Sequence, residues 1–274
     1  MKKYSQKLSN EFDSLFENEL LVMFPERSHP GIRHNKGKYR FELERIASAL
    51  DSNGTGKVPS ILDVGCGFGV NLIMSKLLWK VDAVGLDRFD EFNDVHEREV
   101  GSRSRVINRM KSIGVMVREL DIITHPFDFE PYKFEVITNF DVIEHFSFSP
   151  MPLIKKMFDS LALGGTLLLG TPNQVHLRNR VRSLFGKNTW EDFDYYINAE
   201  IFYGHVREFT PNEFRLICET LSKQVAIYYS TYPLHYKASV AKNQLGKMFF
   251  VTSDYILRMF PKLNYYMIGA VVKS

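Results

Sequence analysis

The stretch ILDVGCGFG, residues 61–69, decides the fold of this chain. An apolar run leads into Gly65, Gly67 and Gly69, and a helix-like stretch, residues 70–79, follows them. Glycines allow a tight turn and let a ligand approach the backbone, and the first turn of a helix offers unpaired N–H groups with positive potential. The segment therefore predicts a strand, a ligand-binding loop and a helix in direct succession.

The spacing of the glycines distinguishes between kinds of ligand loop. A dinucleotide fingerprint needs a further glycine where this chain has Val70, and the Gly-Lys-Ser/Thr of a phosphate loop is absent. What remains is G-x-G-x-G preceded by an acid, Asp63, two residues before the first glycine. A carboxylate at the end of the strand favours a ligand with an ammonium group and repels a pyrophosphate.

Outside the loop, short apolar runs alternate with helical stretches, which predicts an α/β fold with a mostly parallel sheet covered by helices on both faces. The runs are residues 61–64, 81–86, 115–120, 134–140 and 166–170, with 224–229 and 266–272 as further strands. We expect an N-terminal helical cap over residues 1–50 and a sheet domain over residues 51–274. Residues 172–210, basic and then aromatic, are an insertion of the kind that commonly forms a lid or substrate loop.

Acidic side chains follow the strands next to the glycine loop. Asp87 ends the second strand, where a carboxylate can accept both hydroxyls of a ribose. Asp121 ends the third, where it could accept an adenine amino group, and Asn139 lies near the end of the fourth. Because ligands of open sheets bind beyond the carboxyl ends of the strands, we expect these groups to converge with Asp63.

Composition excludes several classes of protein. Lys and Arg exceed Asp and Glu by 35 to 32, an excess too small to demand a nucleic-acid partner. Cys66 and Cys218 form neither a disulfide framework nor a metal knuckle and suit a reducing compartment. No signal peptide is recognisable, and no window approaches the roughly 18 apolar residues of a membrane span, so we expect a cytoplasmic protein.

Together these segments resemble class I S-adenosylmethionine-dependent methyltransferases over roughly residues 38–274. The resemblance is carried by LDVGCGFG, by GLD at 85–87, by LDI at 120–122, by FEVITNFDVIEHF at 134–146, with Glu135 where Asp is usual, and by LALGGTLLLGTPN at 161–173. More narrowly, HVREFTPNEF at 205–214 resembles ubiquinone-pathway O-methyltransferases. HLRNRVRSLFGKNTW at 176–190 is similar to a lid in relatives encoded with surface-polysaccharide and lipid pathways.

The resemblance implies a Rossmann-like sheet of seven strands with the last one antiparallel. It also implies S-adenosyl-L-methionine as methyl donor and S-adenosyl-L-homocysteine as product. The donor site that it implies comprises Asp63, Gly65, Cys66, Gly67, Gly69, Asp87, Arg88, Asp121, Ile122, Asn139 and Phe140. We add Arg40, on the helix before the sheet, because an arginine fork matches the carboxylate of the donor, although an ordinary surface arginine also fits.

Two histidines are candidates for the general base. His145 follows the fourth strand, and imidazole has an unperturbed pKa of about 6.5, which suits a base near neutrality. The alternative is that it only shapes the loop. His205 lies just before a predicted capping box, Thr210 with Glu213, that does not need it, so it could face the acceptor. We expect Tyr203, Arg207 and Asn173 to contact the acceptor.

A metal site is not expected. Asp141, Glu144 and His145 are similar to an E-x-x-E-H arrangement that is associated with a divalent cation in the ubiquinone-pathway relatives. Here the first position is the shorter Asp, and D-x-x-E-H also occurs in relatives that hold no metal.

Two further segments each allow more than one interpretation. The basic run at 178–182 fits a solvated face or an anionic acceptor. Residues 242–261 fit a membrane contact, an acceptor cover or, as we expect, packing against the lid.

The resulting hypothesis is methyl transfer, to oxygen in the first instance, on a small-molecule, glycan or lipid-linked acceptor. One alternative is a module that binds the donor or scaffolds a complex without turnover. Another is a protein or RNA methyltransferase. The sequence has no basic-aromatic RNA surface, nor does an Asn/Asp-Pro-Pro-aromatic motif follow the fourth strand. We therefore expect no nucleic-acid partner, while peripheral contact with a membrane and the oligomeric state remain open.

Overall fold

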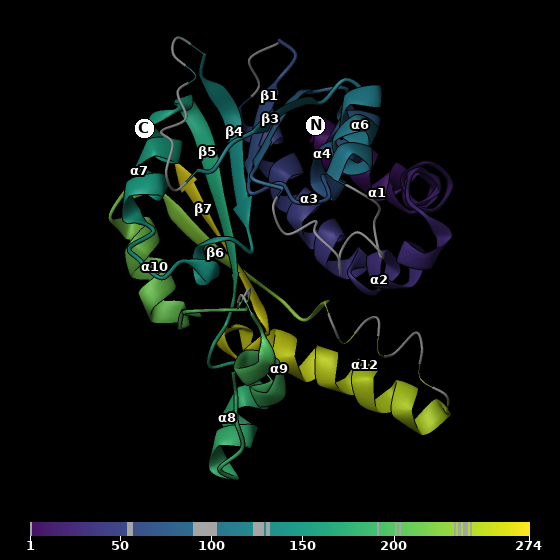
Figure 1. Cartoon of the computed structure of the whole chain (residues 1–274), viewed down its shortest axis with the longest axis vertical. Coiled ribbons are helices and arrows are strands. Elements are labelled where there is room, and N and C mark those ends of the chain that lie inside the picture. Colours follow the sequence, from purple (N-terminus) through teal and green to yellow (C-terminus); the bar gives the residue numbers. More distant parts are fainter. Residues whose placement is uncertain are drawn as a thin grey trace.

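A seven-stranded sheet runs through the centre of the molecule in the computed structural model (Figure 1). The structure describes residues 2–53, 57–89, 103–122, 129, 132–190, 192–200, 202, 204–232, 234, 237, 241 and 243–274. The strands are β1 (Ser60–Val64), β2 (Asp82–Asp87), β3 (Met116–Glu119), β4 (Phe134–Phe140), β5 (Leu161–Pro172), β6 (Val225–Ser230) and β7 (Tyr266–Val272). Their order across the sheet is β3-β2-β1-β4-β5-β7-β6.

The pairing of the strands confirms the expected fold. β1 to β5 are parallel, and β7 lies antiparallel between β5 and β6. All seven apolar runs in the sequence became strands, because a parallel strand covered on both faces is apolar along most of its length. β5 begins earlier than expected, at Leu161 rather than Thr166, and the register shifts where it runs alongside the start of β4.

Helices cover both faces of this sheet. The helices are α1 (Lys3–Leu15), α2 (His29–His34), α3 (Lys36–Ser52), α4 (Val70–Trp79), α6 (Arg103–Ser112), α7 (Met151–Asp159), α8 (Leu177–Leu184), α9 (Phe193–Asn198), α10 (Pro211–Glu219) and α12 (Gln244–Met259). Short turns η1 (Phe16–Leu20), η2 (Leu21–Met23), η3 (Glu26–Ser28), η5 (Ile143–His145) and η6 (Pro261–Leu263) join them. In Figure 1, α1, α3, α4 and α6 lie to one side of the sheet and α7 and α10 to the other.

The N-terminal helices share a hydrophobic core with the sheet. Phe12, Phe16 and Leu20 are buried in one cluster with residues of α3, α4 and β1. Burying each such side chain contributes about 2 kcal/mol to the free energy of folding. Packing therefore continues across residue 50, the boundary that the sequence predicts. That residues 1–50 form a separate helical cap stays a prediction.

The arm, as we call α8, α9 and α12, extends away from the sheet (Figure 1). We expected residues 242–261 to pack against the lid, and α12 leaves Leu245, Met248 and Tyr255 exposed, so this face of the helix takes no part in such packing. Among the residues that the structure describes, no helix combines the length and apolar character needed to cross a membrane.

Candidate functional site

The glycine loop turns sharply at the carboxyl end of β1. Gly65, Gly67 and Gly69 have φ angles of 79°, 49° and 74°, the left-handed region that favours glycine. The N–H groups of Gly65 and Cys66 both donate to the carbonyl oxygen of Leu86, at 2.8 and 3.1 Å. The loop is thereby held against the end of β2, and α4 starts directly after it.

Asp87 ties the loop to β2 through its carboxylate. Its Oδ2 accepts a hydrogen bond from the N–H of Gly67 at 2.8 Å, and its Oδ1 accepts one from the N–H of Phe89 at 2.9 Å. Burial raises the pKa of Asp87, and these backbone hydrogen bonds oppose the rise. Each oxygen keeps a second lone pair, so the carboxylate can still accept from a ligand's hydroxyls.

Asp63 is buried between the two neighbouring strands. It lies beside Gly85 of β2 and Thr138 of β4, and the hydroxyl of Thr138 donates to its Oδ1 at 2.7 Å. Burial raises the pKa of Asp63 to about 7, and the negative charges of Glu42 and Asp87 act in the same direction. A cation placed next to Asp63 would stabilise its charged form.

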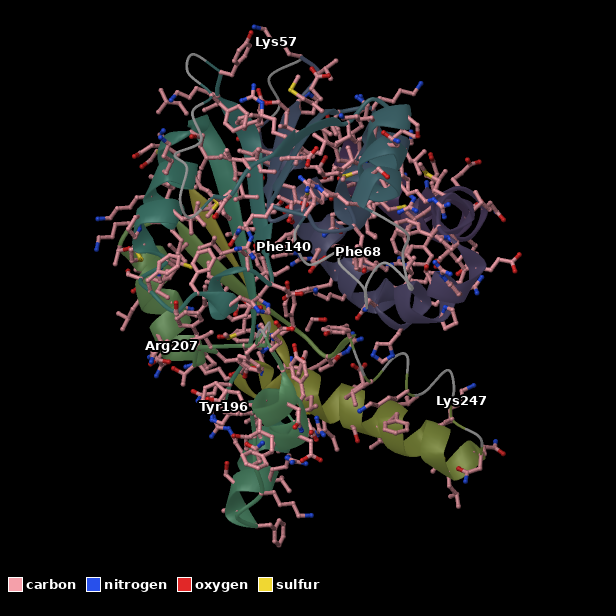
Figure 2. All side chains as sticks on the ribbon, in the orientation of Figure 1. Lys57, Phe68, Phe140, Tyr196, Arg207 and Lys247 are labelled. Carbon is pink, nitrogen blue, oxygen red and sulfur yellow. The ribbon has the colours of Figure 1, made fainter. Side chains whose placement is uncertain are left out.

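A cleft of about 540 Å³ opens beyond the carboxyl ends of β1, β2 and β4. It is lined by Lys38, Tyr39, Glu42, Asp63, Gly65, Cys66, Gly67, Phe68, Val70, Asn71, Asp87, Arg88, Asp121, Ile122, Phe140, Asp141, Val142, His145, Phe146, Ser147, Phe148, Phe202 and Gly204. Figure 2 labels Phe140, at the end of β4, and Phe68, in the glycine loop, at the same level of the molecule. The cleft thus combines an acidic floor with aromatic walls.

Most of the expected donor-site residues meet at this cleft. Besides Asp63 and Asp87, they are Gly65, Cys66, Gly67, Arg88, Asp121, Ile122 and Phe140. Asn139 instead supports the cleft from below, because its buried side-chain amide donates to the carbonyl oxygen of Val64 at 2.7 Å and links β4 to β1. Gly69 is not among the lining residues: a Cβ there would lie 2.2 Å from Met110 Sδ, so it packs against α6.

Arg40 does not reach the cleft. It points to the other side of α3, where it pairs with Asp13 at 3.2 Å and Glu44 at 3.6 Å beside a separate cavity of about 650 Å³. Lys38 lines the cleft in its place and contacts Asp141. Two residues along a helix correspond to a rotation of about 200°, so Lys38 and Arg40 face opposite ways. Lys38 was not among the residues predicted from the sequence, although its i,i+4 spacing to the buried Glu42 marks that face of α3.

His145 lines the other end of the cleft, and the second candidate, His205, lies beside it. Their rings lie 5.0 Å apart, centroid to centroid, and nearly perpendicular. The Nδ1 of His145 is 3.2 Å from the carbonyl oxygen of Gly204, and the Nδ1 of His205 is 2.7 Å from Glu208 Oε1. Both acceptors favour a proton on Nδ1, which leaves the lone pair of a neutral ring on Nε2.

Glu144 lies buried between these histidines and the sheet. Its Oε2 accepts a hydrogen bond from the Thr171 hydroxyl at 3.2 Å, whereas its buried Oε1 has no hydrogen-bond partner among the described residues. Burial raises the pKa of Glu144 to about 7, while the nearby His205 lowers it. Its backbone carbonyl accepts from the N–H groups of Val206 and Arg207, so η5 holds the segment that carries His205.

This cluster could hold a metal ion. Glu144, His145 and His205 each offer one ligand atom, and these atoms lie within 4.8 Å of one another. A carboxylate and two imidazoles suit a cation such as Zn²⁺, and a histidine whose other nitrogen is bonded to a carbonyl or carboxylate is the usual metal-binding arrangement. The set differs from the sequence motif because Asp141 contacts Lys38 and His205 stands in its place.

The expected acceptor contacts are not assembled in the described part of the cleft. Arg207 is exposed and pairs with Glu213 at 2.9 Å, beside the confirmed capping box of α10 (Figure 2). Asn173 is buried, where its side chain donates to the carbonyl oxygens of Lys262 and Asn264 and so joins β5 to η6. Neither side chain therefore lines the described part of the cleft. Tyr203 lies outside the described residues.

Residues that the sequence analysis missed form the wall at this end. Phe146 and Phe148 stack with a centroid distance of 4.9 Å and line the cleft together with Phe202. The first two continue directly from η5, which was a signal in the sequence, because residues after the fourth strand end at the same edge as the glycine loop. Phe202 reaches the cleft from the insertion, and only the folded chain reveals that contact.

Solved structures of methyltransferases share the fold of this chain. The solved structure of the plantazolicin methyltransferase BpumL in complex with SAH aligns over 100% of this chain and 95% of that chain, with a TM-score of 0.52 and 15% identity. Phosphoethanolamine N-methyltransferase 2 of Haemonchus contortus, in complex with S-adenosyl-L-methionine, aligns over 84% of this chain and 52% of that chain, with a TM-score of 0.52 and 15% identity. At such identities the likeness concerns the fold.

Sequence comparison gives the family directly. No curated protein sequence matches the chain significantly. A family model described as a methyltransferase domain matches residues 32–222, which is more than half of the chain and includes the glycine loop and the histidine cluster. The chain therefore belongs to the methyltransferase domain family.

Proposed function

We propose that the chain binds S-adenosyl-L-methionine in the acidic cleft and transfers its methyl group to an acceptor. The charge of the cleft carries this proposal. Among the described residues, five carboxyl groups line it, Glu42, Asp63, Asp87, Asp121 and Asp141, against two cations, Lys38 and Arg88. A ligand with a sulfonium and an ammonium group complements this surplus of acids, whereas a pyrophosphate would be repelled.

We propose a place for each part of the donor from the groups at the strand ends. The ammonium group fits beside Asp63, where a positive charge compensates the buried carboxylate. The ribose hydroxyls fit Asp87, and the adenine fits beside Asp121 and Ile122. Lys38, in the first turn of α3, supplies the cation for the donor's carboxylate, which is the role that the sequence suggested for Arg40.

His145 is the general base of the proposed reaction. When bound, the donor supplies an electrophilic methyl group on a sulfonium. The chain's task is to align the acceptor oxygen with that carbon, to keep water away and to take up the proton that the acceptor loses. His145 lines the cleft with Nδ1 directed at the Gly204 carbonyl, so Nε2 of the neutral ring accepts the proton. His205, held by Glu208, packs against His145 and positions it.

The acceptor that we propose is a small-molecule, glycan or lipid-linked hydroxyl compound. The aromatic wall of Phe146, Phe148 and Phe202 supports an apolar or ring-bearing group next to the reacting oxygen. The neighbours in the fold act on chemically different acceptors: by their names, plantazolicin and phosphoethanolamine. The fold alone therefore does not specify the acceptor, and our proposal rests on the residues at the histidine end of the cleft.

Calorimetry with S-adenosyl-L-methionine tests the donor site. We expect binding to the wild type and at least a tenfold weaker affinity for Asp87→Ala, because the ribose loses its acceptor. Asp82→Ala is the matched control, since Asp82 begins the same strand at its opposite, exposed end. Absence of binding to the wild type would refute the donor assignment.

Turnover distinguishes the enzyme from a module that only binds the donor. We expect the donor to be consumed when a panel of hydroxyl acceptors is supplied, and we expect His145→Ala to abolish most of that consumption. Donor binding without consumption across small-molecule, glycan and lipid-linked acceptors would favour the binding module. Consumption of the donor only when a protein or RNA acceptor is supplied would identify the chain as a protein or RNA methyltransferase.

The proximity of Glu144, His145 and His205 favours a second chemistry for the same acceptor. A divalent cation held there would lower the pKa of a bound hydroxyl, so that no protein base is needed. A chelator distinguishes catalysis by a histidine base from catalysis by a bound metal ion. If His145 is the base, the rate survives chelation, whereas a rate that is lost on chelation and restored by one added divalent cation assigns the histidines as ligands.

A further inference from the structure

Helix α12 exposes its apolar face. Leu245, Met248, Val251, Tyr255 and Met259 follow one another at spacings of three or four residues and are all more than half exposed. Such spacing places them on one side of the helix. Lys247 and Arg258 border this stripe on one side of the helical wheel, and Arg258 pairs with Asp254 at 2.9 Å. A helix with an apolar stripe turned outwards requires something to cover it, because exposed apolar surface is costly in water.

Helix α8 ends in a second apolar projection. Leu184 and Phe185, the last residue of α8 and its C-cap, are 83% and 74% exposed. The chain then turns back through Gly186, which has a φ angle of 62°. Together the two side chains form an exposed apolar tip.

The tip of α8 is surrounded by positive charge. Residues 177–190 contain the cations Arg178, Arg180, Arg182 and Lys187 and no Asp or Glu. None of the three arginines forms an ion pair with an acid in the described part of the chain. Arg180 and Arg182 direct their Nε–H groups to backbone carbonyls, of Val175 and Asn188, at 2.6 Å each. The charges therefore remain available to an external anion.

Both helices project from the same end of the molecule. Figure 1 shows α8 and α12 beyond the end of the sheet where the arrow of β4 points. Figure 2 places Lys247 near the far tip of α12, away from Phe140 and the cleft. The segment after α9 returns from the arm to the cleft through Phe202 and Gly204. The apolar and basic arm thus lies at the same end of the sheet as the mouth of the cleft.

We propose that α8 and α12 dock on the surface of an anionic lipid bilayer. The apolar stripe of α12 and the tip of α8 would enter the boundary between headgroups and acyl chains, and the cations would face anionic headgroups. Interfacial helices bind by this combination of buried apolar area and electrostatic attraction. The helices lie on the bilayer and do not cross it.

Charge favours a lipid surface over a second copy of this chain. A twofold interface brings the same patch of both subunits together, and on α8 that would oppose arginines with arginines. Anionic headgroups supply the missing counter-charge. The docking itself does not depend on methyl transfer. Only its consequence rests on the proposed function: a cleft that opens towards the bilayer would take a lipid-linked acceptor from it.

Vesicle flotation of the full chain tests the docking without any need for activity. The vesicles are phosphatidylcholine alone and an equimolar mixture with phosphatidylglycerol. We expect binding to the mixture, weaker binding to the neutral lipid, and loss of binding at high salt. Phe185→Glu and Met248→Glu should each weaken binding to the mixture at least tenfold, because each places a carboxylate in the interface. Arg178→Gln should weaken it about fivefold.

Leu163→Glu is the matched control. Leu163 is 82% exposed, close to the 83% of Leu184, but it lies in β5 before the glycine pair, at the opposite end of the sheet from the cleft. Its substitution should leave binding unchanged. The thermal melting of every variant shows whether it folds.

Three outcomes would overturn the proposal. The first is no flotation of the wild type with either vesicle. The second is binding that Leu163→Glu weakens as much as Met248→Glu does. The third is a protein that dimerises in solution through this face, so that Met248→Glu yields monomers while vesicle binding is absent. Donor calorimetry needs no vesicles, and flotation needs no donor. A failure of the docking proposal therefore does not affect the proposed donor site, and a failure of the donor site does not affect the docking proposal.

Discussion

The two ends of the cleft are built in different ways. At the glycine-loop end, backbone N–H groups hold the loop, and Asp63, the glycines and Asp87 come from two short stretches around the ends of β1 and β2. At the histidine end, the contact between His145 and Gly204 joins residues 59 positions apart, and side chains carry most of the geometry. The difference suggests that the first end is inseparable from the fold, whereas the second can be altered without unfolding the chain.

The largest expected effect is that of Gly65→Ala at the glycine-loop end. A Cβ there would lie 2.3 Å from Val142 Cγ2, and the φ angle of 79° adds backbone strain. We expect a loss of about 3 kcal/mol in the free energy of unfolding and no measurable donor binding. Urea denaturation and calorimetry measure the two quantities.

Gly67→Ala is the comparison for that change. Gly67 has a φ angle of 49°, but no atom lies within 4 Å of a Cβ placed there. We expect a loss of only about 1 kcal/mol in stability, with donor binding weakened because the methyl group enters the cleft. If both variants retain full stability, the glycine-loop end is less dependent on the fold than we infer.

The sequence predicted the glycine-loop end because its geometry is local. An apolar run followed by G-x-G-x-G specifies strand, turn and helix within about twenty residues, and parallel strands bring Asp63 and Asp87 to one edge. The seven strands followed from their apolar runs for the same reason. Asn139 shows the limit: its place in the fourth strand was predicted, but not that its amide would turn inwards to Val64.

The next largest effect concerns the histidine end. His145→Ala should reduce kcat at least a hundredfold, because the acceptor loses its base, while donor affinity and stability change little. His205→Ala should cost about tenfold, since His205 positions the ring of His145 through an edge-to-face contact. Single-turnover rates measure both. A large loss of stability in either variant would contradict the distinction between the two ends.

The histidine end could not be predicted fully because its contacts are nonlocal. The sequence named His145 and His205, but nothing in their separate segments specifies a 5.0 Å approach of the rings. Asn173 and Arg207 were expected at the acceptor, yet one satisfies backbone carbonyls near η6 and the other pairs with the capping Glu213. The direction in which the side chain of a loop residue points depends on its packing partners, and these come together only in the folded chain.

A smaller effect is a pH dependence from Asp63. Burial raises its pKa from 3.8 to about 7, so the folded protein keeps a proton that the unfolded chain loses near pH 4. The free energy of unfolding should therefore fall as the pH rises from about 4 to about 7, by roughly 3 to 4 kcal/mol, and then level off. Asp63→Asn should remove this part of the pH profile, as measured by urea denaturation.

Donor binding should offset the cost of charging the buried Asp63 if the donor's ammonium group lies beside it. The positive charge lowers the pKa of the carboxyl, so binding near pH 6.5 releases a proton. Calorimetry in two buffers of different ionisation enthalpy detects the release, and Asp63→Asn should abolish it. Equal heats in both buffers for the wild type would place the ammonium group elsewhere.

The smallest expected effect separates the two faces of α3. Lys38→Met should weaken donor affinity about fivefold, because the donor's carboxylate loses its cation in a cleft with a surplus of acids. Arg40→Met should leave donor affinity unchanged, since Arg40 lies on the opposite face, and its exposed pairs with Asp13 and Glu44 contribute less than about 1 kcal/mol to stability. The two variants remove the same charge, and their positions differ by only two residues. A long-range field would affect both affinities alike, so only a direct contact of Lys38 with the donor produces the difference.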